Sequence, residues 1–133
     1  MLDAVATGKL RAMSMVDAIR AWDVLEKAAR AGKEDIPLRR ALCQSDLFYL
    51  LVRVCGRKDM LHPWVYARVR EVEADPDGNL ELWSRGHFKS SIITFGLTVQ
   101  DILKDPDETF GIFSHTRPIA KAFLRQIMRE LES

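Results

Sequence analysis

The chain has 133 residues, which is enough for one domain of ordinary size and too few for two complete ones. Apolar residues make up 47% and charged residues 29%, a balance typical of a folded globular chain and not of a disordered one. Twenty basic residues nearly cancel 19 acidic ones, and the net charge of +1 excludes a polycation that binds nucleic acid by overall charge alone. No apolar run approaches the roughly 20 residues that a membrane span needs.

Cysteine and histidine are sparse. The two cysteines, Cys43 and Cys55, are too few for a disulfide framework and match no zinc spacing, so we expect reduced thiols in a cytosolic protein. The three histidines, His62, His87 and His115, lie far apart with no carboxylate or cysteine at ligand spacing. This distribution argues against a metal site built on them.

The first half of the chain has helical periodicity. Ser14 has the character of an N-cap, and apolar residues follow it at three- and four-residue steps as far as Gly32. This pattern predicts an amphipathic helix that stops near the glycine. A further helix is expected to be capped by Ser45 or Asp46 and to end before Gly56.

The second half begins with one more helix and then changes character. Pro63 suits the first turn of a helix, which must end by the turn residues 75–78. Residues 80–83 are short, apolar and bounded by turn residues, and they predict a strand. A loop at 84–88 then leads into a helix over 89–103.

A second strand and a last helix complete the predicted pattern. Residues 109–113 predict the strand, and Pro118 begins the helix. Strand, helix, strand and helix in this order imply a parallel pair with a right-handed crossover. We therefore predict an α/β fold, in which a helical N-terminal segment (1–60) precedes a βαβα unit (61–133) with an incomplete parallel sheet.

The loop between the first predicted strand and its helix has the composition of a phosphate-binding P-loop. It ends in Lys89 and Ser90, and the first N–H groups of a helix have no intrahelical partner, so they can bind phosphate oxygens. A lysine there neutralises the β- and γ-phosphates, and a serine hydroxyl can hold Mg²⁺. The usual pattern GxxxxGK[ST] would place glycines where this chain has Trp83 and Phe88. The alternative is a tight strand-to-helix turn with an exposed lysine.

Four features follow one another over the last 70 residues or so. His62 and Trp64 open a helix, and the loop over 85–91 has the sequence Arg-Gly-His-Phe-Lys-Ser-Ser. An Asp-Pro-Asp turn follows the next helix, and residues 112–116 then lead into an apolar helix. Their order and spacing resemble the ATPase region of the large terminase subunit of tailed bacteriophages, the motor that pumps DNA into the capsid. That family has an adenine-side segment upstream and a deviant Walker A, commonly Arg-Gly-His-Gly-Lys-Ser-Thr. The first 60 residues carry no such resemblance.

The resemblance implies a role for individual loop residues. Lys89 would contact the β/γ-phosphates, Ser90 would bind Mg²⁺, and Arg85 would be the catalytic arginine that acts in cis on the γ-phosphate. The implied nucleotide-binding set is Trp64, Arg85, Gly86, His87, Phe88, Lys89, Ser90 and Ser91. Phe88 departs from the family glycine, and a side chain at that position is expected to block close approach of the backbone to phosphate or to force an unfavourable dihedral angle.

The resemblance implies an N-terminal portion of an ATP-driven DNA-packaging motor, with ATP and Mg²⁺ as cofactors. Residues 61–133 would be the start of a P-loop ATPase domain that is truncated before the Walker B strand. We therefore expect a piece of an ATPase that is not competent alone and that lacks the nuclease domain of the family. The implied partners are double-stranded DNA, the small terminase subunit and the portal, with no membrane and the oligomeric state open. The implied location is the cytoplasm of the infected bacterial host.

A second group of candidate residues lies at the start of the last helix. Thr116, Arg117 and Lys121 are candidates for contact with DNA phosphates, as in similar segments of helicase-like motors. Arg125 and Arg129 continue the basic stripe. A plain N-cap and a solvated helix face are the alternatives.

Two other interpretations of the whole chain stay open. One is a fragment of another P-loop nucleic-acid motor of helicase-like type. The other is a helical protein-interaction module with a vestigial P-loop, whose N-terminal helices would bind the small terminase subunit or a portal-type partner. Binding of nucleotide separates the motor interpretations from the module.

Overall fold

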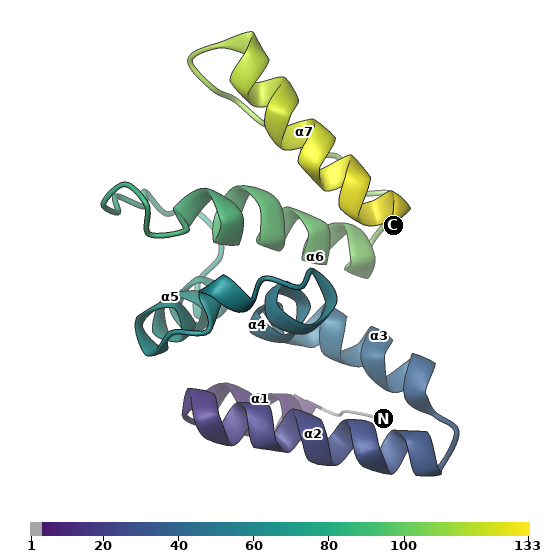
Figure 1. Ribbon diagram of the computed structural model, residues 1–133. Coiled ribbons are helices and arrows are strands. Elements are labelled where there is room, and N and C mark those ends of the chain that lie inside the picture. Colours follow the sequence, from purple (N-terminus) through teal and green to yellow (C-terminus); the bar gives the residue numbers. More distant parts are fainter. Residues whose placement is uncertain (1–3) are drawn as a thin grey trace.

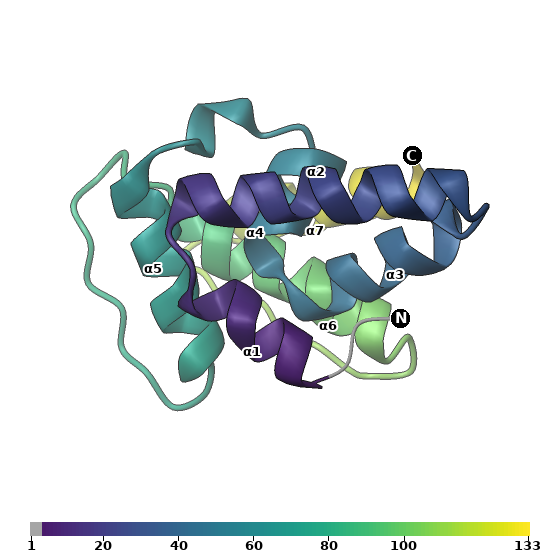
Figure 2. The same cartoon turned by 90° about the horizontal axis from the view of Figure 1, so that it is seen from below.

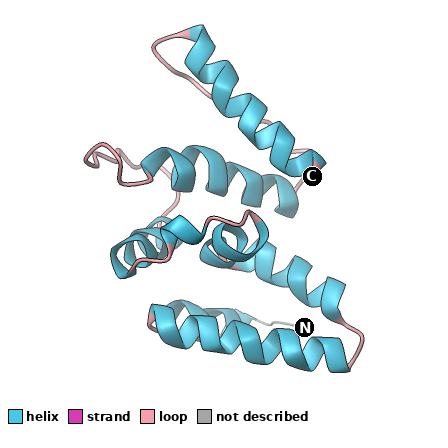
Figure 3. Cartoon of the chain, in the orientation of Figure 1, coloured by secondary structure: helices cyan, strands magenta, loops and turns pink. Residues whose placement is uncertain are grey.

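All regular elements in residues 4–133, the part of the chain that the computed structural model describes, are helices (Figures 1 and 3). The α-helices are α1 (Ala4–Ala12), α2 (Met15–Ala31), α3 (Asp35–Ser45), α4 (Leu47–Tyr49), α5 (Pro63–Ala74), α6 (Thr98–Lys104) and α7 (Arg117–Glu132). The tighter or wider helical segments are the π-helix η1 (Leu50–Val54), the 3₁₀-helix η2 (Lys58–Met60) and the π-helix η3 (Ser90–Leu97).

The helices stack in layers (Figure 1). α1 and α2 form the first layer, α3, α4 and α5 the second, η3 with α6 the third, and α7 lies across the outside of the third. Figure 2, which looks at the first layer, shows α1 and α2 covering α3 and α4. The same view shows the connection from α5 to η3 running around the outside of the molecule.

Local signals in the sequence set several helix ends, and these predictions are confirmed. The Ser14 hydroxyl accepts the N–H of Asp17 at 3.3 Å and caps α2, which ends at Gly32. Pro63 occupies the first turn of α5, where its missing N–H leaves no helical bond unmade. His62 caps the same helix, because its Nδ1 accepts the N–H of Trp64 at 3.1 Å.

A buried carboxylate joins three helices at the centre of the molecule. Asp46 is only 2% exposed. It lies between α3 and α4, and its carboxylate caps α4 by accepting the N–H of Tyr49 at 3.0 Å. The indole of Trp22 in α2 donates to it at 3.0 Å, and the guanidinium of Arg70 in α5 donates at 3.0 and 3.2 Å. A buried carboxylate needs such partners, so Asp46 fixes how α2, α4 and α5 meet.

The helices before and after residue 60 share one core. The side-chain amide of Gln100 in α6 donates to the carbonyl of Cys43 in α3 at 3.1 Å, and that of Gln44 donates to the carbonyl of Leu103 at 2.8 Å. A Cβ on Gly96 in η3 would lie 2.8 Å from the Leu51 side chain in η1. The two helices therefore approach closely because position 96 is a glycine.

The predicted α/β fold is wrong. Residues 80–83 and 109–113 were expected to be parallel strands of a βαβα unit, and neither segment pairs with another in the described part of the chain (Figure 3). Leu80 is 83% exposed, Leu82 81% and Phe113 95%. The apolar runs that suggested strands therefore point largely into solvent.

The physical reason is that a strand depends on neighbours and a helix does not. A helix pairs its own N–H and C=O groups, whereas a strand needs another strand on at least one side and helices over both faces of a parallel sheet. Two short segments cannot supply these partners. None of the helices in residues 4–133 is both long and apolar enough to cross a bilayer.

Candidate functional site

The loop predicted to bind phosphate surrounds a hollow. Nine consecutive residues, 83–91, line an open space of about 540 Å³ at the start of η3. The loop projects from the N-terminal end of η3, at one edge of the third layer (Figure 1). The predicted loop residues therefore line one concave surface.

Two residues of the loop have left-handed backbone geometry. Gly86 has φ of 82° and Phe88 has φ of 63°. The left-handed region is unfavourable for a side chain such as that of Phe88, which stands where the resembled family has glycine. The chain thus adopts at position 88 a conformation that suits the glycine better than the phenylalanine. The unfavourable dihedral angle expected from this replacement is present.

The helix that follows the loop opens toward the same hollow. The N–H of Ile92 donates to the carbonyl of Phe88 at 2.9 Å, which closes the first helical turn. The N–H groups of the preceding residues, 89–91, come before that turn and have no carbonyl upstream within the helix. Lys89 and Ser90 line the hollow and are exposed. A phosphate there would meet unpaired amides, the positive end of the helix dipole and an ammonium group.

The residues that line the hollow also determine how Mg²⁺ can be held. They include the hydroxyls of Ser84, Ser90 and Ser91 and no carboxylate. Mg²⁺ binds through one or two carboxylates together with phosphates and water, and it loses water reluctantly. The lining therefore fits Mg²⁺ that arrives bound to a triphosphate, with Ser90 as a hydroxyl ligand, and not free Mg²⁺ in a preformed cage.

Trp64, which the resemblance assigns to the nucleotide-binding set, lies beside the loop in the structure. Its ring centroid lies 5.1 Å from that of His87 and 5.8 Å from that of Trp83. A second hollow of about 390 Å³ lies between the start of α5 and the loop; it is lined by Asp59, His62, Trp64, Val65, Gly86, His87 and Phe88. An aromatic wall of this kind can stack a planar ring such as a nucleobase.

Sequence reasoning missed an ion pair beside the loop. Arg57 and Asp59 form a bidentate pair, and Arg57 also donates to Ser91 and lies over the ring of Phe88. Their mutual hydrogen bonds raise the pKa of Arg57 and lower the pKa of Asp59. Both groups therefore stay charged at neutral pH. No periodicity or motif in the sequence marks them, because they meet the loop only through the packing of η1 on η3.

The second predicted group lies elsewhere. Thr116 stands at the N-cap of α7, and its side chain makes no capping hydrogen bond. Arg117 and Lys121 are exposed and line a third hollow of about 400 Å³, which shares no residue with the loop hollow. Most of its other lining residues are apolar, from α6, α7 and the connection between them. The structure thus places the predicted DNA-contacting residues apart from the predicted nucleotide site.

Comparison with protein-family models, with curated proteins and with solved structures gave no match. The geometry of the loop and of its surroundings therefore carries the functional argument.

Proposed function

We propose that loop 83–91 binds the phosphates of MgATP and that the chain is a portion of a DNA-packaging ATPase of the large-terminase kind. One observation carries this proposal: nine consecutive residues line an open hollow of about 540 Å³ at the start of a helix, and a lysine and a serine are among them. Converging amides, a helix N-terminus and an ammonium group are the elements with which proteins bind phosphate chains.

The proposed roles follow from the chemistry of phosphoryl groups. Lys89 neutralises the β- and γ-phosphates, and the Ser90 hydroxyl contacts the metal ion that accompanies the nucleotide. Arg85 is exposed and lines the hollow, and its proposed role is contact with the γ-phosphate. Bound Mg²⁺ would supply neutralisation of charge on the β- and γ-oxygens. Trp64 and His87 would hold the base in the adjoining hollow.

The same geometry supports binding without turnover. No Asp or Glu lines the loop hollow, so nothing there positions a carboxylate to orient the attacking water. We expect this chain to bind MgATP and to hydrolyse it no faster than its Lys89→Ala variant does.

The direct test is titration calorimetry of MgATP against the chain, with Lys89→Ala and Lys27→Ala in parallel. Lys27 is an exposed lysine of α2, remote from the loop residues, and serves as the matched control for loss of one positive charge. We expect micromolar binding that is weakened at least tenfold by Lys89→Ala and unchanged by Lys27→Ala. Absence of binding by the wild-type chain at millimolar MgATP would contradict the proposal.

We propose the contact with DNA because of the positive charge on α7. The exposed stripe formed by Arg117, Lys121, Arg125 and Arg129 presents four cations at one-turn spacing on α7. Phosphate contacts of this kind weaken DNA binding as salt rises, so removing Arg117 and Lys121 should reduce both affinity for duplex DNA and its salt dependence. The small terminase subunit and the portal remain proposed partners on the resemblance.

A second candidate function is the helical interaction module with a vestigial P-loop. It is favoured by the finding that all regular elements in the described residues, 4–133, are helical. Its proposed partner is a small terminase subunit, bound by the N-terminal helices. Binding of that subunit by a chain that shows no heat of binding with MgATP would favour this function over the first.

A further inference from the structure

Arg57 makes three kinds of contact beside the loop. Its Nε and Nη2 donate to the two carboxylate oxygens of Asp59, each at 3.0 Å. Its Nη1 donates to the Ser91 hydroxyl at 3.2 Å. Its guanidinium carbon lies 5.8 Å from the ring centroid of Phe88. One side chain from the turn between η1 and η2 therefore touches the loop at its left-handed residue and at its first helical turn.

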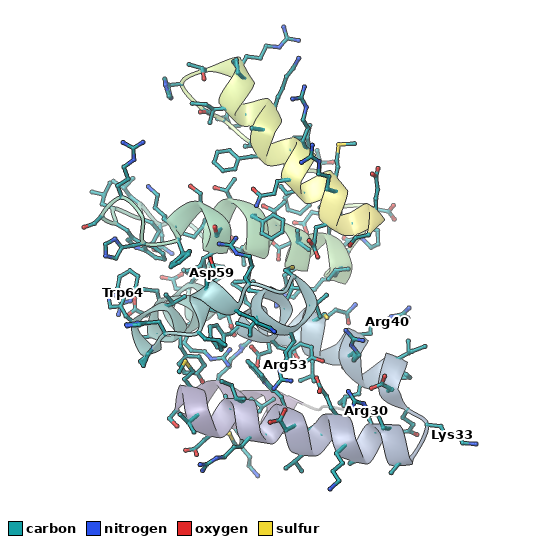
Figure 4. The ribbon with its side chains drawn as sticks, in the orientation of Figure 1. Arg30, Lys33, Arg40, Arg53, Asp59 and Trp64 are labelled. Carbon is teal, nitrogen blue, oxygen red and sulfur yellow. The ribbon has the colours of Figure 1, made fainter. Side chains whose placement is uncertain are left out.

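Asp59 holds this guanidinium in one orientation. The pair is bidentate, and such pairs fix geometry as well as charge. Because Asp59 is half-exposed, the ion pair itself adds little to stability. Its effect is to leave Nη1 directed at Ser91 and the guanidinium over the ring of Phe88. Figure 4 shows Asp59 on the side of the molecule where Trp64 lies, next to the loop.

The loop needs such a contact because its backbone is unfavourable without one. A phenylalanine in the left-handed region persists only where its surroundings hold it. The ring of Phe88 is partly buried against the core, with Arg57 on it. The conformation at Phe88 in turn sets the direction in which the amides of residues 89–91 leave the loop.

We propose that Arg57 is a positioning residue that holds loop 85–91 in its phosphate-binding conformation through Phe88 and Ser91. The inference rests on the proposed triphosphate site for its functional part. It also gives a role to the N-terminal segment: residues outside the loop and its helix determine whether the loop is ordered before nucleotide arrives.

The chain offers a matched control in Arg53. Arg53 lies in η1, four residues before Arg57, and it also combines an ion pair with an aromatic contact. Its Nη2 contacts Asp23 at 2.7 Å, and its guanidinium carbon lies 5.8 Å from the ring of Trp22. Figure 4 shows Arg53 turned toward α2, away from the loop side. Removing it therefore removes similar interactions without touching the loop.

The first experiment measures the loop without nucleotide. Backbone ¹⁵N order parameters of residues 86–91 are compared in the wild-type chain, Arg57→Gln and Arg53→Gln. We expect values near those of rigid backbone, about 0.85, in the wild type and Arg53→Gln, and values below about 0.6 in Arg57→Gln. Unchanged loop order in Arg57→Gln would overturn the inference. Asp59→Asn gives a second test if Arg57→Gln does not fold, with a smaller loss of order expected.

The second experiment measures MgATP affinity of the same variants. We expect Arg57→Gln to weaken binding at least tenfold and Arg53→Gln to change it less than twofold. Ser91→Ala and the double variant Arg57→Gln/Ser91→Ala complete a double-mutant cycle. The double variant should lose little more MgATP affinity than Arg57→Gln alone. Arg57→Lys cannot make all three contacts and should retain only part of the affinity.

The outcomes separate this inference from the proposed function. If the wild type does not bind MgATP although Arg57→Gln loosens the loop, the proposed function fails and the positioning role of Arg57 stands. If the wild type binds and Arg57→Gln binds equally well, the inference fails and the proposed function stands.

Discussion

The helical body around Asp46 and the two long connections, 75–89 and 105–116, are opposite kinds of structure. In the body, a carboxylate that is 2% exposed has hydrogen-bonding partners from α2, α4 and α5. In the connections, Leu82 and Phe113 are largely exposed. Charge is buried and paired in one region, while apolar side chains face solvent in the other.

The difference teaches where stability and function reside in this molecule. Burial and paired polar groups stabilise the body, whereas the connections contribute few buried contacts and carry loop 83–91. The body contacts the loop through Arg57, at Phe88 and Ser91, and through Trp64, at Trp83 and His87. Three substitutions sharpen this comparison.

The largest effect is expected at the centre of the body. Asp46→Ala removes the cap of α4 and leaves the buried guanidinium of Arg70 with Glu73 as its remaining carboxylate partner. We expect the free energy of unfolding to fall by about 3–5 kcal/mol, measured by urea denaturation followed by circular dichroism. Asp23→Ala, which removes an exposed partner of Arg53, should cost about 1 kcal/mol or less. Equal losses in both variants would contradict the central role of Asp46.

An intermediate effect is expected where η3 packs on η1. In Gly96→Ala the new Cβ would lie 2.8 Å from Leu51 Cδ2 and 3.1 Å from the Ser91 carbonyl oxygen. We expect a loss of about 1–3 kcal/mol from this overpacking, by the same denaturation experiment. Gly8→Ala is the control, because nothing lies within 4 Å of its Cβ and it should stabilise α1 by about 0.5–1 kcal/mol. A stabilising Gly96→Ala would show that the two helices do not pack as described.

The smallest effect is expected in the connections. Phe113→Ser should change the free energy of unfolding by less than about 0.5 kcal/mol, because the ring is 95% exposed. Phe95→Ala, at a buried position in η3, should cost about 3–5 kcal/mol. A large loss in Phe113→Ser would mean that the connection packs against the body in solution.

The sequence predicts the helices well because their signals are local. Ser14, Gly32 and Pro63 each mark a helix end through interactions within a few residues, and the structure confirms all three. The predicted strands fail because an apolar run such as 80–83 indicates burial only if partners exist elsewhere in the fold. The order of apolar and polar residues within one segment does not show whether such partners exist.

The loop shows the same limit at the level of the site. Its position before a helix, its lysine and serine, and the unfavourable geometry of Phe88 could all be predicted from local sequence. The ion pair of Arg57 and Asp59 could not, since it reaches the loop across more than 30 residues of chain. Contacts of that range follow from packing and leave no local pattern.

The most direct test of the central claim, that loop 83–91 binds phosphate chains, is an NMR titration of the ¹⁵N-labelled chain with MgATP. We predict that the amide signals of residues 86–91 shift the most, that those of Trp64 and His62 follow, and that signals of α2 and α3 stay unchanged. Shifts confined to other helices, or none at millimolar nucleotide, would contradict the account.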